Sequence, residues 1–118
     1  MVGLRNRERD EIKERKQQYG IKHLSPQDVA QNSDAIKSWL KACGASKVVI
    51  HFEMDALDPT EIIAAVGTDP DGMKMEEVIR VINDIAAEKE LVGLTIAEPM
   101  PRTAIRIKNM LNQLPLLK

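Results

Sequence analysis

The sequence has few of the residues that characterise several large protein classes. Its 118 residues include one cysteine, Cys43, and one each of tryptophan, tyrosine and phenylalanine. A single cysteine forms no internal disulfide, and Cys43 stands where a helix is expected to end, so we expect a buried, unreactive thiol. Three aromatic side chains are too few for a platform that stacks the bases of a single-stranded nucleic acid.

An excess of charge and long apolar runs are also missing. The 17 basic and 18 acidic residues leave a net charge of -1, so nothing in the balance indicates a nucleic-acid or anionic-membrane partner. Charged residues interrupt every apolar run, so the sequence predicts neither a transmembrane helix nor a signal peptide. We therefore expect a cytoplasmic protein, with residues 1–118 forming one domain.

What the sequence does have is an alternation of strand-like and helix-like segments. The run KVVIHF has three consecutive β-branched residues and no formal charge after its first lysine, which is typical of a strand covered on both faces. Such an alternation predicts a three-layer α/β/α fold with a mainly parallel sheet of about four strands. The strands are expected at 2–4, 20–25, 47–52 and 91–98, and the helices at 5–19, 26–43, 75–86 and 104–114.

The expected helices differ in how much apolar surface they carry. The first is almost wholly charged, so we expect it to be solvated. Ser25, Pro26 and Asp28 match the N-cap, N1 and N3 positions of a helix start. That helix should continue to Gly44 and bury one apolar face. The apolar face predicted for this helix contains Val29, Ile36, Trp39, Leu40 and Cys43.

Acidic side chains gather where two expected strands end. The stretch HFEMDALDP, residues 51–59, contains Glu53, Asp55 and Asp58, and Glu98 follows the last strand. Strand alternation puts Glu53 and Asp55 on one side, within reach of one hard cation such as Mg²⁺, Mn²⁺ or Ca²⁺. The residues alone leave two interpretations open: a metal site, or carboxylates that cap and solvate a strand end. Asp58 precedes a proline and is also typical of a turn.

Three motifs in order resemble the carboxyl-terminal half of the arginase family, the ureohydrolases that include arginase, agmatinase and formiminoglutamase. In that family the patterns read S-F-D-x-D-x-x-D-P, G-T-P-x-x-G-G and E-x-N-P. The upstream segments VGLR and YGIKHLSPQDV resemble the same family, so the similarity covers nearly the whole chain and implies half of an arginase-like fold. The motifs here are VVIHFEMDALDP (48–59), AVGTDPDG (65–72) and LVGLTIAEPMP (91–101).

The resemblance implies manganese-dependent hydrolysis of a guanidino compound to urea. Glu53 and Asp55 occupy the D-x-D positions, which bind a pair of Mn²⁺ ions that share the attacking hydroxide in that family. Glu98 would face the substrate guanidinium, a planar cation that a carboxylate binds with paired hydrogen bonds. Asp58 would support the turn. His51 replaces the family's serine and is a further candidate metal ligand, although a lone histidine at a strand end is more often structural.

Several departures from the family bear on activity. Glu53 replaces an aspartate, the EPMP segment lacks the asparagine, and the 118 residues contain neither G-G-D-H nor D-A-H-x-D, the family's other ligand segments. Two functions stay open. The chain is a hydrolase whose site is completed by a complementary amino-terminal half or by homo-oligomers, or it is an inactive truncated domain that acts as a folding or assembly module. An exposed strand edge also predicts self-association.

Overall fold

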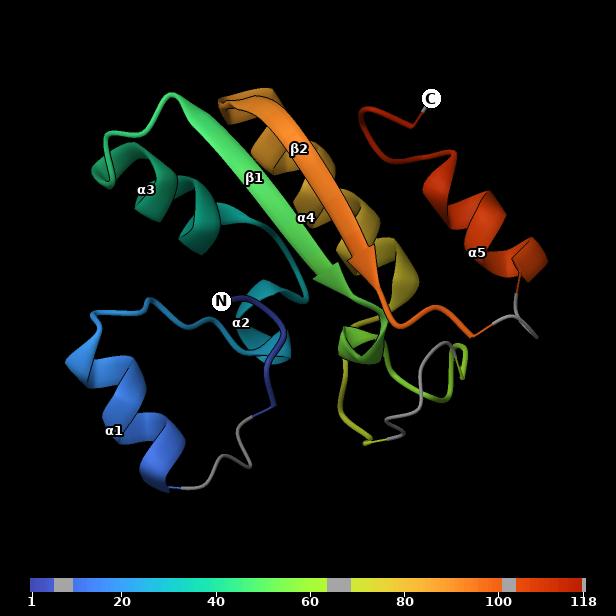
Figure 1. Ribbon diagram of the computed structural model, residues 1–118, viewed down its shortest axis with the longest axis horizontal. Helices are drawn as coiled ribbons and strands as arrows, with labels where there is room; N and C mark the ends of the chain where they lie inside the picture. Colours follow the sequence, from blue (N-terminus) through green and yellow to red (C-terminus); the bar gives the residue numbers. More distant parts are fainter. Residues whose placement is uncertain (6–9, 64–68, 101–103, 118) are drawn as a thin grey trace.

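The computed structural model describes residues 1–5, 10–63, 69–100 and 104–117. Strands and helices alternate along the second half of the chain, and the sheet lies among helices α3, α4 and α5 (Figure 1). The parallel α/β arrangement predicted from the sequence is confirmed. The elements are α1 (Asp10–Gln18), α2 (Pro26–Val29), α3 (Asp34–Ala42), β1 (Lys47–Glu53), the 3-10 turn η1 (Met54–Ala56), α4 (Met75–Glu88), β2 (Glu90–Ala97) and α5 (Ala104–Leu111).

The sheet of the described residues consists of β1 and β2. They pair in parallel from Lys47 opposite Glu90 to Glu53 opposite Ala97, with one irregularity between Val48 and Val49. The connection between the strands includes α4, which lies behind both of them in Figure 1. The two carboxyl ends therefore meet at one edge, as they do in any parallel pair.

The strands expected at 2–4 and 20–25 contribute only one isolated bridge, between Val2 and Leu24. The described sheet therefore has two strands instead of about four. The first residues of the second segment complete the end of α1, because the amide of Gly20 bonds to Gln17 and the amide of Ile21 bonds to Lys16. Gly20 has a φ of 62°, the left-handed conformation that closes many helices, so the segment starts as a turn.

The core lies on one side of β1. Ile50 is partly buried and Phe52 is 5% exposed, whereas Val49 is 66% exposed and His51 is also exposed. Because successive side chains of a strand point to opposite faces, one face of β1 packs on the core and the other faces solvent within the described chain. The helices supply much of the remaining core, with buried Val29, Ile36, Leu40, Val78, Val81, Ile82, Ile107 and Met110.

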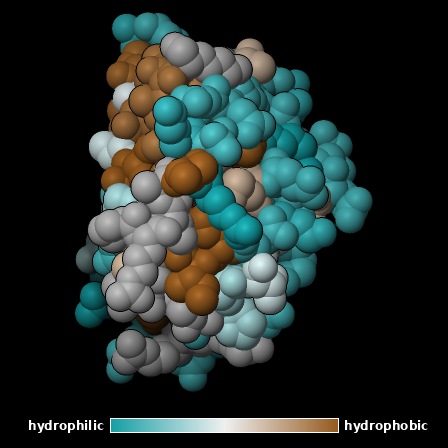
Figure 2. All heavy atoms as spheres, turned by 90° about the vertical axis from the view of Figure 1, so that its right-hand side faces the viewer, coloured by the Kyte–Doolittle hydropathy of each residue, from teal (hydrophilic) through white to brown (hydrophobic). Residues whose placement is uncertain are grey.

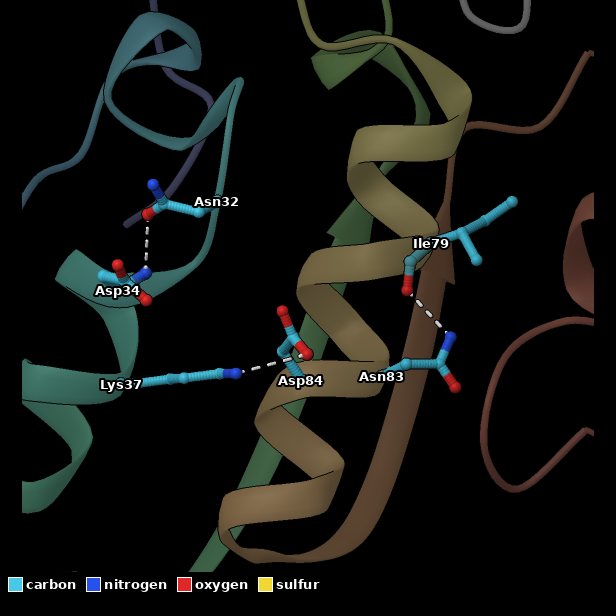
Figure 3. A network of polar contacts seen from close by, with 6 residues as sticks. All are labelled: Asn32, Asp34, Lys37, Ile79, Asn83 and Asp84. Atoms are coloured by element: carbon cyan, nitrogen blue, oxygen red, sulfur yellow. Dashed lines mark hydrogen bonds and ion pairs between the residues drawn. The ribbon is translucent and has the colours of Figure 1, made fainter.

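The helix expected from 26 to 43 is instead two helices. The start is as predicted, because the Ser25 hydroxyl accepts a hydrogen bond from the Asp28 amide and the Asp28 carboxylate accepts one from the Ser25 amide. The chain then breaks after α2, and Asn32 Oδ1 accepts a 3.0 Å bond from the Asp34 amide at the start of α3 (Figure 3). Arg80 fixes the break by donating to the carbonyl oxygens of Val29 and Ala30.

The second helix, α3, buries fewer side chains than expected. Ile36 and Leu40 are each 2% exposed, but Trp39 is 46% exposed and Cys43 is exposed. The expected buried positions of Trp39 and Cys43 are therefore wrong. The buried stripe of α3 is therefore narrower than predicted: it contains Ile36 and Leu40, one helical turn apart, and leaves Trp39 and Cys43 at its exposed margin.

Polar contacts join α4 to its neighbours on both sides. Lys37 of α3 lies 3.4 Å from Asp84, and Asn83 donates to Ile79 within α4 (Figure 3). The Asn83 amide group also donates a 3.0 Å bond to the carbonyl of Gln113, beyond α5. These bonds place α4 between α3 and the carboxyl-terminal segment.

Hydrophobic side chains gather on part of the face that carries β2 and α5, and hydrophilic ones cover much of the rest of that view (Figure 2). Within α5, Ile105 is 79% exposed, while Met110 is 1% exposed. None of the described helices is long and apolar enough to span a membrane.

Candidate functional site

The acidic stretch lies at the carboxyl end of β1. The strand ends at Glu53, and Asp55 belongs to the following 3-10 turn, so the two carboxylates do not follow one strand alternation as expected. The turn closes with a 3.2 Å bond from the Leu57 amide to the Met54 carbonyl. Glu53 and Asp55 nevertheless line the same cavity, of about 370 Å³, together with the segment 1–5.

Glu53 is engaged by the neighbouring histidine. His51 Nε2 lies 2.7 Å from Glu53 Oε1, and His51 Nδ1 lies 2.6 Å from Thr95 Oγ1 on β2. The side chains of His51 and Glu53 are 60% and 42% exposed, so this chain of contacts runs along the solvent face of the sheet. His51 and Glu53 therefore lie on the same side, as strand alternation predicts, and the ring holds one carboxylate oxygen.

Arg5 holds the acidic turn in place through hydrogen bonds to backbone carbonyls. No sequence motif had indicated a role for Arg5 at this site. Its Nη1 donates a 2.5 Å bond to the carbonyl of Asp55, and its Nη2 donates to the carbonyls of Leu57 at 3.1 Å and Asp69 at 2.8 Å. Gly72 makes room for this guanidinium, since a Cβ there would lie 2.5 Å from Arg5 Nη2. No local pattern indicates the role, because the partners lie 50 or more positions away.

Asp58 makes the contacts of a turn-forming aspartate. Its Oδ1 accepts bonds from the Thr60 hydroxyl and, at 2.9 Å, from the Thr60 amide, and its Oδ2 accepts a 3.0 Å bond from the Gly72 amide. These bonds, led by the one from the Thr60 hydroxyl, lower the pKa of Asp58 below its usual value, because they favour the ionised form. The carboxylate thereby joins the turn after β1 to the loop before α4.

Glu98 is the residue that follows β2, at the carboxyl end of the sheet. Ala97 is the β2 partner of Glu53, and Glu98 is the next residue, so both acidic residues stand at the same carboxyl edge. Glu98 has a φ of 57°, a left-handed conformation that is uncommon for a residue other than glycine. Such conformations persist where surrounding structure enforces them and are frequent at functional sites.

The described residues do not by themselves form a metal site. Hard oxygen donors suit Mn²⁺, and octahedral coordination takes about six ligands. Among the described residues, no group of three or more His, Cys, Asp or Glu side chains is placed to hold an ion. A manganese ion held by Glu53 and Asp55 would need further ligands from outside the described residues.

Comparisons with known proteins show what the chain is similar to. The Arginase family model matches residues 1–111. A curated relative, the N(1)-aminopropylagmatine ureohydrolase of Thermus thermophilus, is 29% identical over 101 residues, which are 85% of this chain and 33% of that protein. The chain therefore spans about a third of the length of the curated relatives that it matches.

Solved structures share the fold. Helicobacter pylori arginase superposes with a TM-score of 0.82 at 11% identity, covering 96% of this chain and 41% of that one. Entamoeba histolytica arginase, in complex with L-ornithine, gives 0.77 at 21% identity, with the same two coverages. The agmatine ureohydrolase of Thermoplasma volcanium gives 0.74 at 24% identity, over 95% of this chain and 39% of that one. The expected part of an arginase-like fold is confirmed.

Proposed function

Since this chain belongs to the arginase family, we propose that it supplies part of the active site of a manganese-dependent hydrolase that releases urea from a guanidino compound. One observation supports this most directly. Glu53 and Asp55 line a single cavity at the carboxyl end of β1, where parallel α/β sheets bind ligands. Glu98 stands at the same edge of the sheet.

Each acidic residue has its own role in this proposal. Glu53 and Asp55 are the metal ligands, because carboxylate oxygens are the donors that Mn²⁺ prefers. Glu98 binds the guanidinium group of the substrate through paired, charge-assisted hydrogen bonds. His51 orients Glu53 through the 2.7 Å contact, and Asp58 holds the turn in shape.

The site requires residues from outside the 118. Two carboxylates leave most of a manganese coordination sphere unfilled, so the remaining ligands come from a complementary amino-terminal half. The curated relatives are long enough to contain such a half, because the matched residues make up 33% of their length.

A second function is favoured by a different observation. One oxygen of Glu53 is already engaged by His51, and no third ligand stands nearby among the described residues. A chain with this arrangement would keep the fold without the chemistry and act as a folding or assembly module. The two functions differ in whether manganese binds when the complementary half is present.

Manganese binding separates the two proposals. The chain would be titrated with Mn²⁺ alone and in the presence of the complementary part of the Thermus thermophilus relative, following the free-ion resonance signal. Asp55→Ala tests the site. Glu90→Ala is the matched control, since Glu90 is an exposed carboxylate at the opposite end of the same strand pair.

We expect saturable binding with the complementary part, lost in Asp55→Ala and kept in Glu90→Ala. Urea release would then be assayed with L-arginine, agmatine and N(1)-aminopropylagmatine, the last named for the relative's own activity. Binding that Asp55→Ala leaves unchanged contradicts the assignment of the ligand. If no binding occurs up to millimolar Mn²⁺ although the two parts form a complex, the assembly-module function is supported instead.

A further inference from the structure

Three polar side chains form a chain of contacts across the exposed face of the sheet. Thr95 of β2 is the register partner of His51 of β1. Thr95 Oγ1 lies 2.6 Å from His51 Nδ1, and His51 Nε2 lies 2.7 Å from Glu53 Oε1. Each ring nitrogen therefore has a partner, and the imidazole connects a hydroxyl group on one strand to a carboxylate on the other.

These partners determine which nitrogen of a neutral His51 ring carries the proton. An ionised carboxylate only accepts hydrogen bonds, so Nε2 is the donor to Glu53. A neutral imidazole has one donor and one acceptor nitrogen, so Nδ1 then accepts a bond from the Thr95 hydroxyl. With the proton on Nδ1 instead, two acceptors would face each other at 2.7 Å. The Thr95 hydroxyl thus stabilises the one neutral form that can donate to Glu53.

In this form His51 supports Glu53 and is not itself a metal ligand. Imidazole binds a metal through a ring nitrogen that carries no proton. The unprotonated nitrogen is Nδ1, which faces Thr95, whereas the nitrogen beside Glu53 carries the hydrogen. To bind a cation beside Glu53, the ring would have to lose its bond to that carboxylate and move its proton to Nδ1.

The same contact limits how Glu53 can present its carboxylate. Glutamate is a long, flexible side chain that loses rotamer freedom when it is fixed. The bond from His51 holds Oε1, and among the described residues no hydrogen bond or ion pair engages Oε2. His51 and Glu53 are also the two positions at which HFEMDALDP departs from the pattern S-F-D-x-D-x-x-D-P, so the longer carboxylate and the ring that holds it occur together.

We propose that Thr95 is a positioning residue for the candidate site. Its hydroxyl holds His51 in the Nε2–H form, and His51 in turn holds Glu53 so that one carboxylate oxygen, Oε2, is left for a cation. The cation rests on the proposed function, whereas the state of the His51 ring does not. Outer partners of this kind keep metal ligands in place, and their loss typically weakens metal binding.

Nitrogen-15 NMR of the full chain follows the His51 ring directly. A protonated imidazole nitrogen resonates far upfield of an unprotonated one, so the spectrum reports which nitrogen carries the proton. The spectra are recorded without manganese at about pH 8.5, where histidine side chains are ordinarily neutral. Thr95→Val removes the hydroxyl and keeps the shape, and Thr95→Ser is the matched variant that keeps the hydroxyl. The second histidine, His23, is the internal control, because its ring contacts Lys16 and the Leu4 carbonyl.

We expect the His51 ring to be protonated at Nε2, with the Nδ1 signal shifted upfield by the bond from Thr95. In Thr95→Val the Nδ1 signal should move downfield and the two tautomers should mix, whereas Thr95→Ser should resemble the unaltered chain. Unchanged His23 signals would show that the fold is kept, as expected for an exposed position such as Thr95. A His51 ring protonated at Nδ1 in the unaltered chain, or one that Thr95→Val leaves the same, overturns the proposal.

Manganese titration then measures the effect on Glu53. With the complementary part of the Thermus thermophilus relative present, Thr95→Val should weaken binding by about tenfold or more, and Thr95→Ser should keep the affinity. Equal affinity in all three chains overturns the positioning role and leaves the proposed function standing. If the unaltered chain binds no manganese although its His51 ring is in the expected form, the proposed function fails and the assignment of Thr95 to the His51 ring stands.

Discussion

Arg5 Nη2 lies 3.1 Å from the carbonyl oxygen of Leu57, although the two residues are 52 positions apart in the sequence. The same guanidinium bonds to the carbonyls of Asp55 and Asp69. The Arg5 guanidinium binds three carbonyl oxygens and so holds together the loop that carries the acidic residues. We call this set of three hydrogen bonds the Arg5 clamp. The stability of the candidate site therefore depends on a residue outside its own sequence motif.

Replacing this clamp should destabilise the fold. In Arg5→Lys a single ammonium replaces the planar fork, so at least one carbonyl loses its donor. We expect the free energy of unfolding to fall by about 1–3 kcal/mol, the range for a hydrogen bond to a charged group. Urea unfolding followed by circular dichroism measures the change. Arg106→Lys is the control, because Arg106 is exposed and donates to one carbonyl, that of Glu61. An equal loss in both variants would contradict the clamp.

The space beside the clamp predicts a second effect. In Gly72→Ala the added Cβ would lie 2.5 Å from Arg5 Nη2 and 2.7 Å from the Asp58 amide nitrogen, both far too close. We expect a loss of about 1–3 kcal/mol, as for other overpacked positions.

Gly93→Ala is the matched control for this change. Its Cβ would meet Val49 Cγ1 at 3.4 Å, an ordinary contact, so the melting temperature should move little. Thermal unfolding of both variants measures the difference, and an unchanged melting temperature in Gly72→Ala would show that Arg5 and the backbone at Asp58 both shift without cost.

The lowered pKa of Asp58 predicts a pH dependence. The unfolded carboxyl group has its usual pKa of 3.8, and the folded one has a lower pKa because of the bonds from Thr60 and Gly72. A lowered folded pKa stabilises the protein above the unfolded value, and this contribution is lost as the pH falls through the folded pKa. Asp58→Asn should therefore cost stability near neutral pH and much less in acid.

Unfolding experiments from about pH 7 to about pH 2 would follow this difference. Asp10→Asn serves as the comparison, because the Asp10 side chain is 91% exposed and pairs with Lys13 at the surface. If the cost of Asp58→Asn stayed constant across the whole range, the carboxylate charge would not contribute to the turn.

The carboxyl-terminal segment is part of the core, which predicts a fourth result. Leu114 is 0% exposed and Leu116 is 59% exposed, two positions apart in the same segment. Leu114→Ala should cost about 2–5 kcal/mol, because it leaves a cavity among buried neighbours, and Leu116→Ala should cost little. Chemical denaturation of the two variants gives the comparison. Similar small losses in both would mean that this segment is not packed against the core in solution.

Much of the fold could be predicted because it depends on neighbouring residues. The run KVVIHF became β1, the solvated first helix became α1 with no buried residue, and the cap at Ser25 formed as expected. The break after Val29 was missed because it depends on Arg80, which binds the carbonyl there from 51 positions away. The residue pattern around Val29 contains no signal for a partner so far away in the sequence.

The candidate site could likewise be predicted only where it depends on neighbouring residues. Its acidic residues could be identified because they follow a strand in a recognisable motif. Their arrangement could not, since Asp55 lies in a 3-10 turn whose carbonyl oxygen is bound by Arg5, 50 positions away. The strand expected at 47–52 formed as β1, whereas the strands expected at 2–4 and 20–25 are reduced to the single bridge between Val2 and Leu24.

Because the hydrogen-bond partners of Arg5 lie 50 or more positions away in the sequence, they also affect when the chain can fold during its synthesis. A ribosome makes a protein from its amino end to its carboxyl end, so the Arg5 guanidinium emerges well before its partners at 55, 57 and 69. The acidic turn cannot be completed until Asp69 has left the exit tunnel, and β1 must wait longer for β2. Long-range contacts of this kind slow folding, so the nascent chain exposes its unpaired β1 for a time before native order can form.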